Sequence, residues 1–392
     1  MQTSFMPAST SSGRQGRFIF IASPLLPVGG GMYKVADLLL RSQTAAPGSG
    51  AMTLRPLETR GGGSAVASAW VLLGALIKLA RARLGGGLAG VHVNMAERLS
   101  LVRKSIIVMA CRVLGVPVVL HLHAVQLHHN YEAMPAVLKA MVRWVFSLPA
   151  GVVVLGRTSM EFVTGQLQVP AHRVQIVING VPGPPAVRTP GRSHALKKVL
   201  FVGNLSERKG VSDLLRALAS PQLRDMAVEA TFAGGGDLAG YRAVAARLGL
   251  GDRVRVAGWA SSQVVSALLE EADALVLPSY DEGLPLVILE ALAHGVAVVC
   301  TPVGEIPHVF TDGVDAFFVK AGDQGSIAQG LQRVLSDDPL REALERNGRA
   351  IYERQFSLAR FCAAIADVHK RHFGICGSGL PQDDPVQAGR GQ

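Results

Sequence analysis

Residues 272–307 read ADALVLPSYDEGLPLVILEALAHGVAVVCTPVGEIP, and this stretch decides the fold class. The short apolar run 274–277 is closed by a proline, which is typical of a buried parallel strand. Proline suits the first position of a helix and glycine the position just beyond one, so a helix is predicted over 285–294. Residues 296–300 then supply a second buried strand. A strand, a helix and a strand in this order predict a parallel α/β sheet.

Two acidic residues interrupt this apolar passage, Glu282 in the loop before the helix and Glu290 within it. Eight helical positions separate them by roughly 12 Å, the span from a sugar ring across a diphosphate to a ribose. The amides of residues 283–286 lie between them at a helix N-terminus, where anions bind. Glu290 could instead be a solvated helix residue and Glu282 a turn residue. Because a helix between two buried strands has little wet surface, we favour ligand-binding acids at the carboxyl edge of the sheet.

The same alternation of strands and helices runs through the whole chain. Strands are predicted at 17–22, 52–54, 91–94, 116–123, 152–155, 174–178, 199–202, 227–233 and 253–257. Helices are predicted near 64–84, 97–114, 133–147, 158–166, 325–335, 338–355 and 357–372. The turn-rich segment 175–185 separates two halves, and we expect the last helix to cross back onto the first half. The chain is long enough for two domains, each with its own core, and each a mainly parallel sheet covered by helices.

The composition limits the kinds of partner. A formal charge of +10 points to nucleic acid, an anionic membrane surface or phosphate-bearing substrates. The sequence has no zinc-finger or aromatic-basic RNA motif, so no nucleic-acid partner is expected. Four scattered cysteines without framework spacing indicate reduced thiols in a cytoplasmic protein, and the N-terminus has no apolar signal core. The most apolar run, 65–79, is shorter than the roughly 20 residues of a membrane span, so we interpret it as a core helix.

Three further groups of residues follow predicted strands. Glycines at 29–31 precede a helix and would let a ligand approach backbone amides, although they do not form the G-x-G-x-x-G fingerprint of dinucleotide-binding domains. Arg208 and Lys209 lie between a strand and a helix, where their charges suit phosphate. His121 and His123 leave the same face of a strand in a histidine-rich run. A metal site is one reading of that run, and a histidine facing the crevice is the one we favour.

Together these residues resemble the retaining glycosyltransferases of the GT-B fold, specifically the large family four (glycosyl transferases group 1), which use nucleotide-diphosphate sugars. The resemblance covers about residues 17–373. Its most specific part is PSYDEGLPLVILEALAHG at 278–295, which is similar to the paired-glutamate motif of the family. Asn-Gly-Val at 179–181 is similar to the interdomain junction. The resemblance implies two Rossmann-like domains that face each other across a cleft.

The resemblance also implies a domain organisation. We expect a disordered N-terminus at 1–16, an N-terminal acceptor domain at 17–182, a C-terminal nucleotide-sugar-binding domain at 183–356 and a flexible tail at 374–392. A crossing helix at about 357–373 would join the N-terminal domain.

Residue roles follow from the same resemblance. Catalytic roles fall to Glu282 at the hydroxyls of the transferred sugar, His123 beside that sugar and Lys209 at the phosphates. Glu290 would bind the ribose hydroxyls of the donor. The other donor-binding residues would be Arg208, Gly283, Leu284, Leu286, Gly30, Gly31, Asn204 and Trp259, the last near the nucleobase.

Two positions depart from the family pattern. Asn204 stands where the family usually has arginine, which removes a charged hydrogen bond worth on the order of 1.5–3 kcal/mol. Arg208 beside Lys209 offers a replacement cation. The sequence GEIPH at 304–308 replaces the usual Gly-Gly-x-Pro-Glu. Both changes are compatible with a reduced activity or with an unusual donor.

The activity implied by the resemblance is retaining, metal-independent transfer of a hexose from a UDP- or GDP-linked donor to a saccharide or lipid-linked saccharide. Polyprenol-linked acceptors and bacterial surface polysaccharide biosynthesis are the expected setting. No cofactor is expected, and the sequence has no Asp-x-Asp motif to hold a divalent metal. A catalytically silent partner subunit and a GT-B sugar-nucleotide epimerase are the alternatives, whereas the missing glycine fingerprint disfavours a nicotinamide-dependent enzyme.

Positive charge on helices of the first half suggests a peripheral contact with the anionic inner membrane surface. The residues concerned are Arg98, Arg103, Lys104, Arg112, Lys139 and Arg143. They do not form one clean stripe on a helical wheel, so ordinary solvated charge is the alternative.

Overall fold

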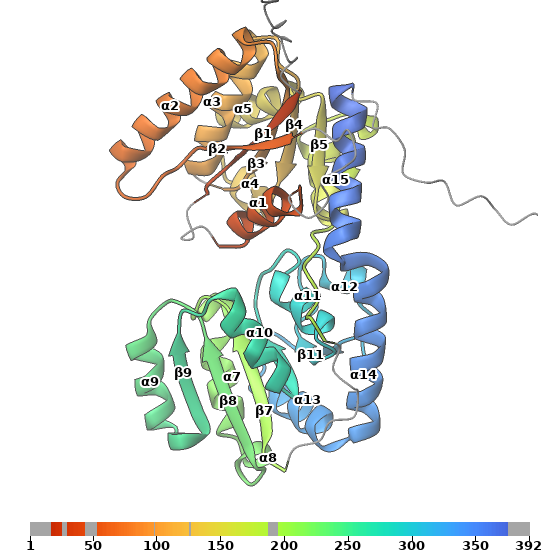
Figure 1. The fold of residues 1–392 in the computed structure, drawn as a ribbon. Coiled ribbons are helices and arrows are strands. Elements are labelled where there is room, and N and C mark those ends of the chain that lie inside the picture. Colours follow the sequence, from red (N-terminus) through yellow and green to blue (C-terminus); the bar gives the residue numbers. More distant parts are fainter. Residues whose placement is uncertain are drawn as a thin grey trace, which may run out of the picture.

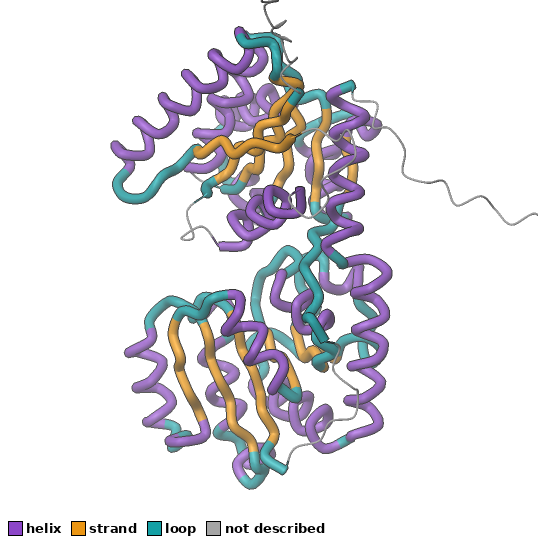
Figure 2. The backbone as a smooth tube through the Cα atoms, in the orientation of Figure 1, coloured by secondary structure: helices purple, strands orange, loops and turns teal. Residues whose placement is uncertain are grey.

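The computed structural model describes residues 17–25, 30–43, 53–97, 99–124, 127–186 and 195–374, apart from the side chains of Gly30 and His129. The predicted disordered N-terminus, Gly29, Arg98 and all but the first residue of the predicted tail lie outside these ranges. Two α/β domains are stacked one above the other, and each contains one parallel sheet (Figures 1 and 2).

The amino-terminal sheet has six parallel strands in the order β2-β1-β3-β4-β5-β6. Its strands are β1 (Phe18–Ser23), β2 (Thr53–Glu58), β3 (Leu88–Met95), β4 (Val118–Leu122), β5 (Gly151–Val154) and β6 (Val174–Ile176). Its helices are α1 (Gly30–Ser42), α2 (Ala65–Leu84), α3 (Leu99–Val113), α4 (Leu127–Glu132), α5 (Ala136–Ser147) and α6 (Arg157–Glu161). Helices α2, α3 and α5 bury their inner sides on one face of the sheet, and α1 covers the other face.

The carboxyl-terminal sheet also has six parallel strands, in the order β12-β11-β10-β7-β8-β9. Its strands are β7 (Lys197–Val202), β8 (Val228–Ala233), β9 (Val254–Gly258), β10 (Ala274–Leu277), β11 (Ala297–Cys300) and β12 (Phe317–Phe318). The helices that follow are α7 (Val211–Leu218), α8 (Pro221–Arg224), α9 (Leu238–Arg247), α10 (Ser262–Glu271), α11 (Leu286–Ala293), α12 (Ile306–Val309), α13 (Gln324–Ser336), α14 (Asp338–Ile351) and α15 (Leu358–Phe373). The predicted α/β class with two Rossmann-like sheets is confirmed.

The stretch that decided the fold forms β10, α11 and β11, and β10 pairs with β11 in parallel. Helix α11 begins one residue later than predicted, because Pro285 has an extended backbone (ψ 128°) and is the N-cap. Gly295 has φ 66°, a left-handed conformation that glycine adopts at little cost just after a helix.

Helix α15 crosses back to the amino-terminal domain, as expected, and runs along its sheet (Figure 1). Its side chains Phe361, Ile365 and Val368 share a buried cluster with Ile19 and Ile21 of β1. The two segments that pass between the domains lie side by side, since Val181 donates to Phe356 O at 3.0 Å and accepts from Leu358 N at 3.0 Å.

Two expectations about the helices of the first half are wrong. Helix α2 is 20 residues long, and only 22% of its most apolar window is buried, so it is a surface helix rather than a core helix. By length and composition it is also the one helix in the described ranges that could cross a membrane. Lys104 is not a surface cation, because it is 1% exposed and its Nζ donates to Ala22 O at 3.0 Å and to Thr59.

The crossing of α15 depends on the absence of a side chain at Gly180. A Cβ there would lie 2.6 Å from Phe361 Cβ and 2.6 Å from Ser357 O, and the latter is backbone that cannot rotate away. We expect Gly180→Ala to lower the free energy of unfolding by about 1–3 kcal/mol in urea titrations. Gly74→Ala is the matched control, since nothing lies within 4 Å of its Cβ position on α2 and it should stabilise by up to ~1 kcal/mol. Equal effects of the two variants would contradict this packing argument.

Candidate active site

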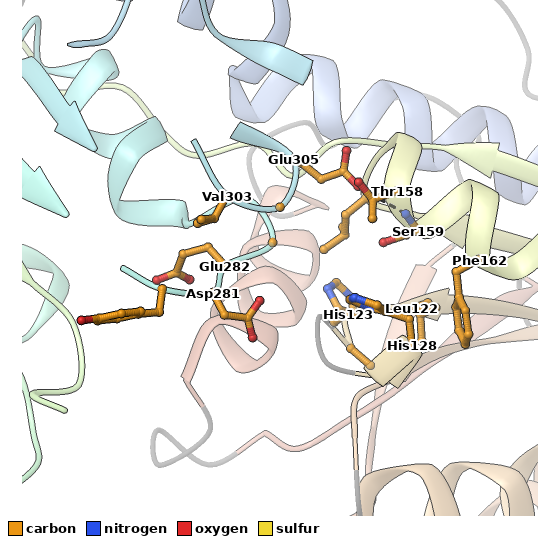
Figure 3. Close-up of a pocket in the computed structure, with 15 residues that line it drawn as sticks. Leu122, His123, His128, Thr158, Ser159, Phe162, Asp281, Glu282, Val303 and Glu305 are labelled. Carbon is orange, nitrogen blue, oxygen red and sulfur yellow. Dashed lines mark hydrogen bonds between the residues drawn. The ribbon is translucent and has the colours of Figure 1, made fainter. Parts of the chain in front are cut away.

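A cavity of about 330 Å³ lies between the two domains, where loops at the ends of both sheets meet (Figure 3). The amino-terminal domain contributes the end of β4, His128 of α4 and the α6 region. The carboxyl-terminal domain contributes the loops after β10 and β11. The lining residues are Leu122, His123, Ala124, His128, Leu155, Thr158, Ser159, Phe162, Tyr280, Asp281, Glu282, Gly283, Val303, Gly304 and Glu305.

His123 follows β4 and lines the cavity, as predicted for a histidine facing the crevice. Its Nε2 lies 2.9 Å from Asn94 Oδ1, an oxygen that can only accept, so Nε2 carries the proton and Nδ1 holds the lone pair. Burial lowers the pKa of His123 to about 3, which keeps the ring neutral. It can therefore accept a hydrogen bond from a hydroxyl, but it does not supply positive charge.

Behind His123 the structure contains a chain of buried histidines from three elements. His92 of β3 lies 3.2 Å from His121 of β4 through its Nε2 and 2.8 Å from His369 of α15 through its Nδ1. Burial lowers the pKa of His92 to about 4 and lowers the pKa of both its neighbours. In the described part of the chain no group of three His, Cys, Asp or Glu residues is placed to hold a metal ion, so the alternative of a histidine metal site gains no support.

Glu282 lines the other side of the cavity and forms an ion pair with Lys209. The two meet because the loop before α7 packs tightly against the end of β10. A Cβ on Gly210 (φ 68°) would lie 2.2 Å from Pro278 O, and Tyr280 N donates to Arg208 O at 2.9 Å. With both side chains largely buried, this pair places a cation beside the predicted sugar-binding acid.

Glu305 joins the two domains directly, and the sequence analysis gave it no role beyond a departure from the family motif. It is 3% exposed, and its carboxylate accepts from Arg157 N at 2.9 Å and Ser159 N at 3.3 Å. These amides belong to the start of α6 in the amino-terminal domain. The feature of the sequence that could have pointed to Glu305 is a single acidic residue among apolar residues after β11.

Glu290 also has a partner in the amino-terminal domain, because it forms an ion pair with Lys34 of α1. Gly31 lies close by, since a Cβ there would be 3.8 Å from Leu286 Cδ1. The predicted glycine loop and the start of α11 are therefore brought together. Lys34 is not among the site residues predicted from the sequence, where its signal is its place one helical turn after Gly31.

The remaining predicted site residues lie outside the cavity lining. Arg208 is exposed, and its Nη1 donates to Asp281 O at 2.6 Å, which holds the guanidinium over the loop that carries Glu282. Leu284 is buried in the core of the carboxyl-terminal domain. Asn204 and Trp259 are both exposed, and they follow β7 and β9 at the same sheet edge.

Two facing Rossmann-like domains with a cavity at the carboxyl ends of their strands define the GT-B fold. Residues 188–351, which include most of the carboxyl-terminal domain, match the glycosyl transferases group 1 family. The chain is similar to the structure of Anabaena Alr3699/HepE in complex with UDP and glucose, with a TM-score of 0.71 and 18% identity over 91% of this chain and 100% of that chain.

Two curated relatives match part of the chain. An uncharacterized glycosyltransferase of Methanocaldococcus jannaschii, MJ1607, is 28% identical over 56% of this chain. The D-inositol 3-phosphate glycosyltransferase of Streptomyces griseus is 35% identical over 43% of this chain. These matches span 59% and 38% of the two relatives' own lengths.

The histidine chain makes stability depend on pH. The buried rings stay neutral while unfolded histidines titrate near 6.5, so below that pH the unfolded state binds more protons. We expect the free energy of unfolding to fall from about pH 6.5 toward pH 4 by roughly 1.4 kcal/mol per unit for each buried histidine. Urea titrations at several pH values measure this slope.

His92→Gln should flatten the slope, because it removes one of these neutral rings, whereas His308→Gln, at an exposed position, should leave it unchanged. A slope that is the same in wild type and His92→Gln would contradict the assignment.

Proposed function

We propose that this protein is a retaining glycosyltransferase that moves a hexose from a UDP- or GDP-linked donor to a saccharide or lipid-linked saccharide acceptor. The observation that carries the proposal is the interdomain cavity, which His123 of one domain and Glu282 of the other both line (Figure 3). The family of residues 188–351 and the UDP and glucose named for the Anabaena structure support this reading. Bacterial surface polysaccharide biosynthesis is the setting that we propose.

The donor would lie along α11 with its diphosphate at the start of the helix. Glu290 would accept hydrogen bonds from the ribose hydroxyls once Lys34 releases it. The amides of 283–286 and the Gly30–Gly31 turn would hold the diphosphate, and the contact of Gly31 with Leu286 supports this shared cradle. Trp259 would lie toward the nucleobase, whereas Asn204 would lie toward the diphosphate, in the place of the usual arginine.

The main contribution of the protein to this reaction would be electrostatic stabilisation of the leaving diphosphate. As the bond from the sugar C1 to the diphosphate oxygen breaks, negative charge develops on the leaving group, where Lys209, Arg208 and the α11 amides could stabilise it. The acceptor oxygen then forms its bond to C1 from the same face, and its proton passes to the departing phosphate. Glu282 and the neutral His123 would orient the sugar hydroxyls during this step.

The alternative that the protein is a catalytically silent partner subunit is supported by Asn204, which replaces the usual arginine. The position of Arg208 favours an active enzyme instead, because its bond to Asp281 O keeps a guanidinium next to the Glu282 loop. The deciding experiment is a donor screen that measures UDP or GDP release with each candidate sugar. Release with no donor, together with no nucleotide-sugar binding in calorimetry, would support the silent subunit, and an altered sugar nucleotide without transfer would support an epimerase.

Replacing the two glutamates should affect different kinetic constants. Glu290→Gln weakens a charged hydrogen bond to the ribose, so the donor KM should rise about tenfold or more with little change in kcat. Glu282→Gln acts at the transferred sugar and should lower kcat. Glu342→Gln on the outer surface of α14 is the matched control and should change neither constant. Unchanged kinetics in both site variants would refute the assignment.

Metal independence is tested separately. We expect excess EDTA to leave turnover unchanged, because Lys209, Arg208 and backbone amides would provide the positive charge that a divalent ion provides elsewhere. Loss of turnover that is restored by added magnesium or manganese would overturn this expectation.

A further inference from the structure

The outer surface of the amino-terminal domain carries an unusual number of exposed apolar side chains. Of the eighteen large apolar residues exposed in the described ranges, twelve lie on α2, α3 and α5. These helices contact one another in the order α2, α3, α5 on one face of the sheet (Figure 1). The largest exposed side chains include Trp70 and Trp144, which are 70% and 52% exposed. We call this surface the α2/α3/α5 face.

The α2/α3/α5 face is also uniformly basic. None of the three helices contains an aspartate or a glutamate. Their partly or fully exposed cations are Lys78, Arg81, Arg83, Arg103, Arg112, Lys139 and Arg143. Apolar side chains interspersed with cations on these helices are complementary to an apolar layer edged by negative charge.

The protein itself does not cover this face in the described part of the chain. The inner sides of the helices, with Leu79, Ile107 and Phe146, already pack on the sheet. The outward residues, such as Trp70 and Val137 (78% exposed), are therefore a second apolar surface on the same elements. An exposed apolar patch of this kind with a charged rim marks an interaction site.

We propose that the α2/α3/α5 face docks the protein on the surface of a bilayer that contains anionic lipids. Tryptophan prefers the boundary between lipid headgroups and acyl chains, and two of the three tryptophans of this chain lie on the face. Helix α2 lies on the bilayer rather than crossing it, because Leu72, Ala75 and Leu79 are buried against the domain. The occupant is thus a lipid surface and not a second copy of the chain, whose face would be equally cationic.

Docking by the α2/α3/α5 face would bring the proposed active site to a lipid-linked acceptor, and this part of the inference rests on the proposed function. In a parallel α/β domain the helices run opposite to the strands, so they begin at the carboxyl edge, on the side of the interdomain cavity. Some of the exposed apolar residues lie in these first turns, at Val66, Leu99, Val102 and Val137, and the others continue along the helices to Leu84 and Val113. Docking by this face would hold the cavity entrance near the membrane, where a lipid-linked acceptor presents its saccharide.

The test uses the full chain carrying Trp259→Phe, so that Trp70 and Trp144 are the only tryptophans. Vesicles of phosphatidylcholine with phosphatidylglycerol should shift the fluorescence to the blue, and brominated lipids should quench it. Vesicles of phosphatidylcholine alone, or high salt, should weaken binding about tenfold or more. Absence of any shift or quenching with the anionic vesicles would overturn the proposal.

Matched variants localise the effect by vesicle sedimentation. Trp70→Ser with Trp144→Ser should reduce partitioning at least about tenfold, and Lys139→Gln with Arg143→Gln should remove part of the salt dependence. Val264→Ser and Arg255→Gln, exposed on the carboxyl-terminal domain, should change neither. Equal loss in the controls would overturn the proposal.

Two other outcomes would also overturn it. A dimer in sedimentation velocity that the double tryptophan variant abolishes would mean that a second copy covers the face. Resistance to alkaline extraction would mean that α2 spans the bilayer. The wild-type chain and the variants of the sedimentation experiment, all of which keep Trp259, are assayed for nucleotide release with a water-soluble acceptor, so failure to dock and failure to transfer sugar are distinguished.

Discussion

The packing of α15 across the amino-terminal sheet is the constraint on which the rest of the structure depends. Phe361 and Phe373 occupy positions that Gly180 and Gly90 leave free of side chains, and His369 reaches the buried His92. Because α15 follows the carboxyl-terminal domain directly, this packing holds that domain with its strand ends turned toward those of the other sheet. The cavity between His123 and Glu282 is a consequence of that arrangement.

Three glutamates at the cleft each have a protein partner, and the partners differ in kind. Glu282 is paired within its own domain with Lys209, whereas Glu290 and Glu305 are bound by groups of the opposite domain. A ribose that took over Glu290 would release Lys34 and so remove one of the two acidic links between the domains. The Glu305 link to the start of α6 would remain. In the donor position that we propose, ribose binding would therefore replace the interdomain ion pair of α11 with a contact to the ligand.

The two faces of the amino-terminal sheet have opposite characters. One is sealed by α1 and α15 and contains the neutral histidine chain, whose rings are buried among apolar groups. The other face is covered by α2, α3 and α5. Their inner side chains pack on the sheet, and further apolar side chains on their outer sides are exposed. These helices therefore carry apolar residues on two sides, and the described chain covers only the inner side.

Hydrophobic period, proline, glycine and local spacing are enough to predict the fold class, the β10–α11–β11 unit and the places of Glu282 and Glu290 in that unit. The sequence also indicated His123, since a strand end places its side chain at a crevice. Only the tertiary structure decided that Lys34 meets Glu290 from 256 residues away, that Glu305 binds α6, and that Lys104 is buried while Trp70 is exposed. Hydrophobic periodicity predicts that a helix has an apolar side. Whether that side is buried depends on which distant segments of the chain pack against it.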